Sequence, residues 1–99
     1  MTVLNNNDID DFLNRYPRWR VENNALKSEF NFVDFRQAMQ FIEAMAHYAD
    51  EIDHHPDWRN VYNRVEVTLT TYSKKSLTHL DLMLAGTMER QYEALKLAA

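Results

Sequence analysis

A long amphipathic helix, predicted over residues 34–53, is the feature that most restricts the fold. Asp34 at its start resembles the first residue of a capping box, with Gln37 three positions later. Pro56 stops the helix, because proline forces the residue before it out of the helical region. One face carries Phe35, Ala38, Ile42, Met45, Ala49 and Ile52, and a second stripe carries Phe41, Ala44 and Tyr48. So wide an apolar surface exceeds what a single sheet covers, which indicates self-association.

Two β-hairpins are predicted, one on each side of this helix along the chain. Asn23-Asn24 is the turn signal of the first hairpin, because asparagine tolerates the positive φ of a tight turn, and the second is expected to turn near Tyr62-Asn63. Apolar and polar side chains alternate around both turns, as they do in strands with one buried face. The predicted strands span residues 18–22, 26–32, 58–61 and 64–72. In the last strand, Val65, Val67 and Leu69 are expected on one face, and Thr68, Thr70 and Tyr72 on the other.

Two further helical patterns lie at the ends of the chain. The first spans residues 7–16 and stops at Pro17, and the second begins at Thr78 and Asp81, which resemble another capping box. The resulting order is α-β-β-α-β-β-α in one domain, residues 1–99. We therefore predict an α+β fold: a two-layer sandwich with a four-stranded antiparallel sheet and the helices on one face.

Two adjacent histidines, His54 and His55, stand where the central helix ends. Pro56 holds His55 extended, so the two imidazoles are expected to leave the backbone in different directions and to flank one small ligand. Neighbouring carboxylates can hydrogen-bond such imidazoles and fix their tautomers, which suits general acid–base catalysis. Alternatively, the histidines only cap the helix, where they complement its dipole. The nearby carboxylates are Asp50, Asp53 and Asp57.

Composition excludes several classes of function. The 15 acidic and 11 basic residues give a formal net charge of -4, which disfavours nucleic acid or an anionic membrane as the partner. The absence of cysteine excludes disulfides, zinc ribbons and thiol catalysis. No apolar run is long enough to span a membrane and no signal peptide is evident, so we expect a cytoplasmic protein. A metal site is also disfavoured, because the chain has no HExxH pattern and His47 lies two helical turns from His54.

The surroundings of the two histidines form a specific pattern. It consists of Asp50-x3-His54-His55-Pro56, followed by Asp57-Trp58-x-Asn60-Val61-Tyr62-Asn63-x-Val65-x-Val67-Thr68-Leu69 and, further on, Asp81. In this pattern the chain resembles the pterin-4a-carbinolamine dehydratase family, also known for a dimerization-cofactor role in transcription. A weaker likeness extends to Trp19 and to residues 30–35. The resemblance implies the same fold, self-association into homodimers or homotetramers, and no metal or bound cofactor.

The implied reaction is loss of water from a 4a-hydroxytetrahydropterin, which gives the quinonoid dihydropterin in tetrahydrobiopterin recycling. A functional link to an aromatic amino-acid hydroxylase is also implied. Dehydration needs one proton delivered to the departing hydroxyl and another removed from the ring nitrogen, and two histidines can exchange these roles. By resemblance, the catalytic residues are His54, His55 and Tyr72. The substrate-binding residues are Asp50, His54, His55, Pro56, Thr71, Tyr72, Ser73, Lys74 and Asp81.

Two positions depart from the family pattern. Tyr72 stands where the family has a third histidine, and a phenol donates hydrogen bonds but is a poor base at neutral pH. Well-placed proton transfer is typically worth ~100- to 10,000-fold in rate, so the alternative is a weakened or inactive homologue. Such a homologue would act as an oligomeric binding, assembly or coactivator protein, through the apolar helix side around Phe41 and Tyr48. Leu80 replaces a common family arginine, and His79 is expected to be a solvated cap rather than a third imidazole in the pocket.

Overall fold

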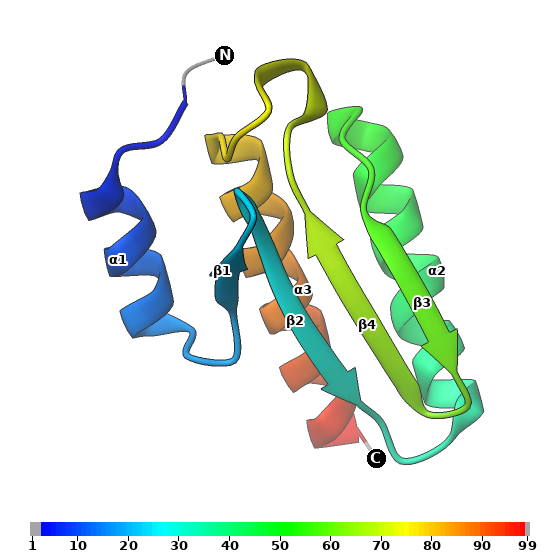
Figure 1. The fold of residues 1–99 in the computed structure, drawn as a ribbon. Helices are drawn as coiled ribbons and strands as arrows, with labels where there is room; N and C mark the ends of the chain where they lie inside the picture. Colours follow the sequence, from blue (N-terminus) through cyan, green and yellow to red (C-terminus); the bar gives the residue numbers. More distant parts are fainter. Residues whose placement is uncertain (1–2, 99) are drawn as a thin grey trace.

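The computed structural model describes residues 3–98, in which three α-helices cover a four-stranded sheet (Figure 1). The strands are all antiparallel and lie in the order β1-β2-β4-β3. Helices α2 and α3 pack against each other behind the sheet, and α1 lies beside β1 at one edge. This arrangement is the two-layer α+β sandwich predicted from the sequence. The elements are α1 (Asn6–Arg15), β1 (Arg20–Glu22), β2 (Ala25–Asn31), α2 (Phe35–Ile52), β3 (Asp57–Val61), β4 (Arg64–Leu69), the 3-10 helix η1 (Tyr72–Lys74) and α3 (His79–Ala98).

Both ends of α2 are set by local hydrogen bonds. Oδ1 of Asp34 accepts the backbone N–H of Gln37 at 2.9 Å, and Oε1 of Gln37 accepts the N–H of Val33 at 3.1 Å. The capping pair predicted at this end is therefore present, with its second bond shifted one residue towards the N-terminus. At the other end Asp53 adopts the left-handed conformation, and the N–H of His54 reaches the carbonyl of Ala49 at 3.0 Å. This left-handed residue turns the chain out of the helix and sends it towards β3.

The position of Phe41 contradicts the exposed second stripe expected on α2. Phe41 is completely buried, with its ring centroid 5.0 Å from that of Phe30 and 5.1 Å from that of Phe32. Phe35, expected on the main buried stripe, is instead 46% exposed. The buried face of α2 is thus rotated towards Phe41, and a binding surface around that residue is not available on this chain. Tyr48 is half-buried against the core.

Both hairpin turns lie at the predicted residues, the second with positive φ at Tyr62 rather than at Asn63, but the last strand is shorter. Asn23 and Asn24 both have positive φ, as a tight turn between β1 and β2 requires. Strand β4 ends at Leu69, because the N–H of Thr71 bonds to the carbonyl of Ser76 at 3.0 Å and closes a loop. The prediction that the strand reaches Tyr72 is therefore wrong, and that residue begins the 3-10 helix η1. No helix of residues 3–98 is both long and apolar enough to cross a membrane.

Candidate active site

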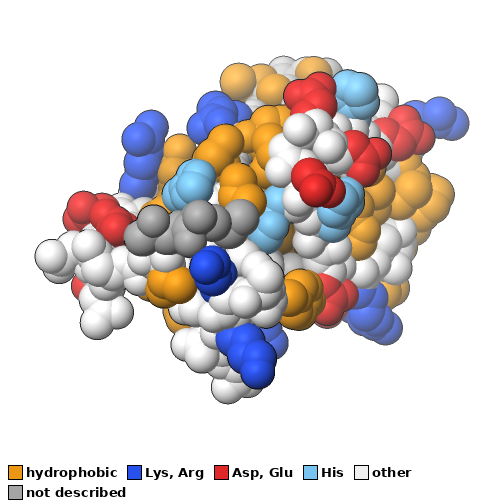
Figure 2. All heavy atoms as spheres, turned by 90° about the horizontal axis from the view of Figure 1, so that it is seen from above, with side chains coloured by type: hydrophobic (Ala, Val, Ile, Leu, Met, Phe, Trp, Pro, Cys, Tyr) orange, Lys and Arg blue, Asp and Glu red, His pale blue; other side chains and the backbone are white. Residues whose placement is uncertain are grey.

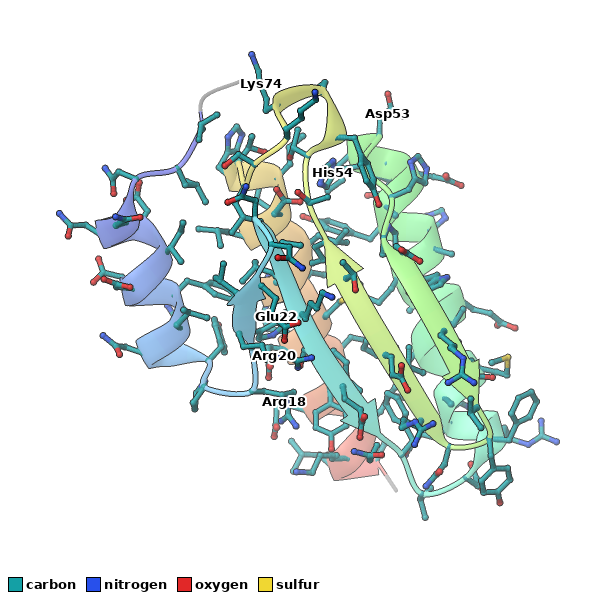
Figure 3. All side chains as sticks on the ribbon, viewed as in Figure 1. Arg18, Arg20, Glu22, Asp53, His54 and Lys74 are labelled. Atoms are coloured by element: carbon teal, nitrogen blue, oxygen red, sulfur yellow. The ribbon has the colours of Figure 1, made fainter. Side chains whose placement is uncertain are left out.

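His54 lies at the end of the molecule where α2 stops and the β4–α3 loop turns back (Figure 3). Its side chain is only 11% exposed, and its Nε2 atom lies 2.6 Å from Oδ1 of Asp81. Asp81 is completely buried in the first turn of α3. The contact therefore joins the segment that follows α2 to the start of α3, through an imidazole and a carboxylate that are 27 positions apart in the sequence.

The carboxylate of Asp81 has three hydrogen-bond donors around it. Its Oδ2 atom accepts the hydroxyl of Thr71 at 2.8 Å and the backbone N–H of Thr78 at 2.9 Å. Its Oδ1 atom faces Nε2 of His54. Such a set satisfies a buried carboxylate, which would otherwise be strongly unfavourable away from water. Because an ionised carboxylate only accepts hydrogen bonds, Nε2 of His54 carries the hydrogen, and Nδ1 is the ring nitrogen without one.

His55 has a different carboxylate and a different environment. Its Nε2 atom lies 2.9 Å from Oδ1 of Asp50, on the last turns of α2. The side chain of His55 is 56% exposed and that of Asp50 is 79% exposed, so this pair faces solvent. The two adjacent imidazoles thus turn to carboxylates on different helices, as expected from the proline that follows them. One imidazole is held inside the protein, and the other is open to water and to a ligand.

Of the remaining predicted site residues, Pro56 is half-buried directly before β3, and the other four lie on the loop that follows β4. Thr71 is buried, whereas Tyr72, Ser73 and Lys74 are exposed, with 68% of Tyr72 accessible. Figure 3 shows Lys74 and His54 at the same end of the molecule. Figure 2 views this end from above and shows histidine side chains at the surface, with acidic side chains next to them. Within residues 3–98, no hydrogen bond joins the Tyr72 hydroxyl to either imidazole.

The other histidines lie outside this arrangement. His47 is 81% exposed on α2 and pairs with Glu51 at 3.0 Å, so it is a surface residue. His79 is exposed at the first position of α3, and Leu80 beside it is half-buried. Among the described residues, no three histidine or acidic side chains are grouped as metal ligands. The fold therefore pairs four of the predicted site residues at this end of the molecule, His54 with Asp81 and His55 with Asp50.

The sequence did not predict that the side chain of Thr78 belongs to the hydrogen-bonded set around Asp81. This side chain was expected to cap α3, but its hydroxyl lies 2.8 Å from the hydroxyl of Thr71. Of the two hydrogen bonds of a capping box only one forms, in which the backbone N–H of Thr78 donates to the side chain of Asp81. The sequence carries no signal for this contact, because the need for several donors follows from the burial of Asp81, which only the structure shows.

Comparison with known proteins identifies the family. The family model described as pterin 4 alpha carbinolamine dehydratase matches residues 2–91. A protein of Prochlorococcus marinus (strain NATL2A), provisionally named pterin-4-alpha-carbinolamine dehydratase, is 37% identical over 90 residues, which are 91% of this chain and 95% of the relative. A protein of Novosphingobium aromaticivorans with the same provisional name is 44% identical over 93 residues, covering 90% of this chain and 97% of the relative.

Solved structures agree with this assignment. The crystal structure of a transcriptional coactivator/pterin dehydratase from Brucella melitensis superposes with a TM-score of 0.87 at 35% identity, covering 92% of this chain and 99% of that one. A pterin dehydratase-like protein described as a RuBisCO assembly factor of the α-carboxysome gives a TM-score of 0.63 at 20% identity, covering 76% of this chain and 87% of that one. At that identity the second likeness shows the fold alone. From its sequence and its structure, the chain belongs to the pterin 4 alpha carbinolamine dehydratase family.

Proposed function

We propose that the protein dehydrates a 4a-hydroxytetrahydropterin to the quinonoid dihydropterin, as a step of tetrahydrobiopterin recycling. The observation that carries this proposal is the pairing of buried His54 with Asp81, next to the exposed His55, in a chain of the dehydratase family. The reaction breaks the bond between carbon 4a and its hydroxyl oxygen. A ring nitrogen forms a double bond to the same carbon, loses its hydrogen to a base, and the hydroxyl leaves as water after receiving a proton.

The two imidazoles are suited to the two proton transfers. His54 has its Nε2–H committed to Asp81, so Nδ1 serves as the acceptor of a proton from the ring nitrogen. His55 is exposed, so it exchanges protons with water and serves as the donor to the departing hydroxyl. Asp50 orients His55 as Asp81 orients His54. The exposed residues Tyr72, Ser73 and Lys74, together with Pro56, would then contact the pterin.

The assay generates the carbinolamine in situ and follows formation of the quinonoid product with and without the protein. We expect a clear acceleration by the unmodified chain and a loss of about 100-fold or more when His54 or His55 is replaced by alanine. His47→Ala is the matched control, because this histidine also pairs with a carboxylate but lies on the exposed surface of α2. A rate with the unmodified chain no faster than in buffer would refute the proposal.

A second candidate function is favoured by one observation, the exposed Tyr72 at the position of the family's third histidine. In this reading the chain is an oligomeric assembly or coactivator protein, roles that the Brucella and carboxysome proteins carry in their descriptions. Tyr72→His separates the two functions. If the unmodified chain is an active dehydratase, Tyr72→His should raise its turnover by less than about tenfold, since the reaction needs only one good proton donor and one good acceptor. A gain of about 100-fold or more from a nearly inactive chain would support the second function.

We also propose that the chain self-associates, that it is functionally linked to an aromatic amino-acid hydroxylase, and that it is cytoplasmic. Support for self-association comes from β3, an edge strand of the sheet, and from apolar side chains that stay accessible beside it. Val61 is 41% exposed and Tyr62 is 63% exposed at the end of this strand. Light scattering coupled to gel filtration tests this part directly, and a monomer at micromolar concentration would contradict it.

A further inference from the structure

Two buried threonine hydroxyls lie behind the carboxylate that holds His54. Thr71 follows β4 and is 4% exposed, and Thr78 precedes α3 and is completely buried. Oγ1 of Thr71 lies 2.8 Å from Oδ2 of Asp81 and also 2.8 Å from Oγ1 of Thr78. The three side chains therefore form one continuous set of hydrogen bonds that reaches His54.

The hydrogens in this set have only one consistent arrangement. A threonine hydroxyl has a single hydrogen, and a carboxylate oxygen can only accept. Thr71 therefore gives its hydrogen to Asp81, and it must accept the hydrogen of Thr78. The order of donation runs from Thr78 to Thr71 to Oδ2 of Asp81, while His54 donates to Oδ1 from the other side. Oδ2 of Asp81 therefore accepts from Thr71, and Oδ1 accepts from His54.

We propose that Thr71 and Thr78 are positioning residues for His54, acting through Asp81. Two donors on Oδ2, one from Thr71 and one from the backbone of Thr78, prevent the carboxylate from rotating. Only Oδ1 then faces the imidazole, which holds the ring in one orientation and one tautomer. The inference rests on the proposed function, and it changes the expected task of Thr71. Its hydroxyl hydrogen is committed to Asp81 rather than offered to a pterin.

The same contacts tie the exposed loop to the imidazole. The backbone N–H of Thr71 bonds to Ser76 at 3.0 Å, so the side chain that supports Asp81 also closes the loop carrying Tyr72. A change in this loop is therefore transmitted to His54 through one hydroxyl. Positioning of this kind is expected to influence the rate of the chemical step more than the binding of substrate.

The test replaces Thr71 with valine, which has nearly the same shape but no hydroxyl. We expect kcat to fall about 10- to 100-fold while KM changes little, because His54 is misplaced but the exposed site is not. Thr71→Ser keeps the hydroxyl and should restore most of the rate. Thr78→Val should lower kcat by a smaller factor, since it removes the outer hydroxyl. The matched control is Thr70→Val, which also deletes one hydroxyl but leaves Asp81 untouched. This hydroxyl lies 2.9 Å from the carbonyl oxygen of Asn24 and 3.5 Å from that of Ser76.

A second measurement does not depend on turnover. Nitrogen-15 NMR of the histidine rings reports which nitrogen of His54 carries the hydrogen. In the unmodified protein we expect the Nε2–H form, and in Thr71→Val a mixture of tautomers or a broadened signal. If the unmodified chain is inactive but its His54 signal changes in this way, the proposed function fails and the positioning inference stands. Unchanged kcat and an unchanged His54 signal in Thr71→Val would overturn the inference, as would a Thr71→Ser variant as impaired as the valine variant. If Thr71→Val does not fold, Thr78→Val and Thr71→Ser decide by the same two measurements.

Discussion

Replacing Asp81 with asparagine removes the buried charge to which His54 is bonded, without changing the size of the side chain. The amide oxygen can still accept from Thr71 and from the backbone of Thr78, which leaves the amide NH2 facing Nε2 of His54. Since two donors cannot bond to each other, the imidazole must move its hydrogen to Nδ1. The nitrogen left free in the unmodified protein would then be unable to accept a proton. We expect turnover to fall about 100- to 10,000-fold.

The expected effect on stability follows from the same three contacts. A hydrogen bond to a charged group contributes about 1.5–3 kcal/mol and one between neutral groups about 1 kcal/mol, so each contact weakens. Neutralising residue 81 also removes the unfavourable desolvation of a buried carboxylate, which offsets part of this loss. Asp81→Asn should therefore lower the free energy of unfolding by about 1–3 kcal/mol. Urea denaturation followed by circular dichroism measures this difference.

Asp50→Asn is the matched control for stability. It makes the same chemical change at a carboxylate that also pairs with a histidine, but this pair is largely exposed to solvent. An exposed ion pair contributes little, so we expect a change within about 0.5 kcal/mol. Equal stability changes for the two variants, or an Asp81→Asn variant with the turnover of the unmodified protein, would refute the reasoning that the buried carboxylate holds His54.

Three further predictions concern the fold and its surface. Phe41→Ala should destabilise the protein by about 3–5 kcal/mol in urea denaturation, because the ring is completely buried, and a loss below about 1 kcal/mol would place the ring at the surface. Gly86→Ala should stabilise it by about 0.5–1 kcal/mol, because an added Cβ would meet only a side-chain atom of Arg90 at 3.5 Å; a lower melting temperature would show that the site is tighter than described. The hydrogen bond and charge of Arg20 lower the pKa of Glu22, so Arg20→Gln should raise that pKa towards the ordinary glutamate value in an NMR titration, and an unchanged value would exclude Arg20 as the cause.

The elements that could be predicted from sequence are those set by signals a few residues apart. Asp34 and Gln37 lie within one helical turn, and their bonds do begin α2. Asn23-Asn24 has the conformation that its residue type favours, so the first hairpin follows from its turn. In both cases the chain needs no distant contact to adopt the local structure.

The errors arose where tertiary packing decides between local alternatives. The apolar residues of α2 allow more than one buried face, and the aromatic cluster with Phe30 and Phe32 selects the face that contains Phe41. Likewise, alternation alone extends β4 to Tyr72. The buried hydroxyl of Thr71 and the bridge to Ser76 end the strand earlier, and neither contact is visible as a period in the sequence.

The candidate site depends both on local sequence signals and on tertiary packing. The burial of Asp81 bears on whether the chain is an active dehydratase. The side chains that cap α1 and α2, Asn5 and Asp34, are exposed, so capping a helix in this fold does not require a buried carboxylate. An apolar residue in place of Asp81 would fill the same space with no charge to desolvate. The buried carboxylate is accounted for by the imidazole of His54 that it holds. Tyr72, one of the two departures from the family pattern, lies on the exposed loop and makes no hydrogen bond to that imidazole in the described part of the chain. The change therefore leaves the positioned His54 intact, and a reduced rate is the expected consequence rather than a complete loss of dehydration.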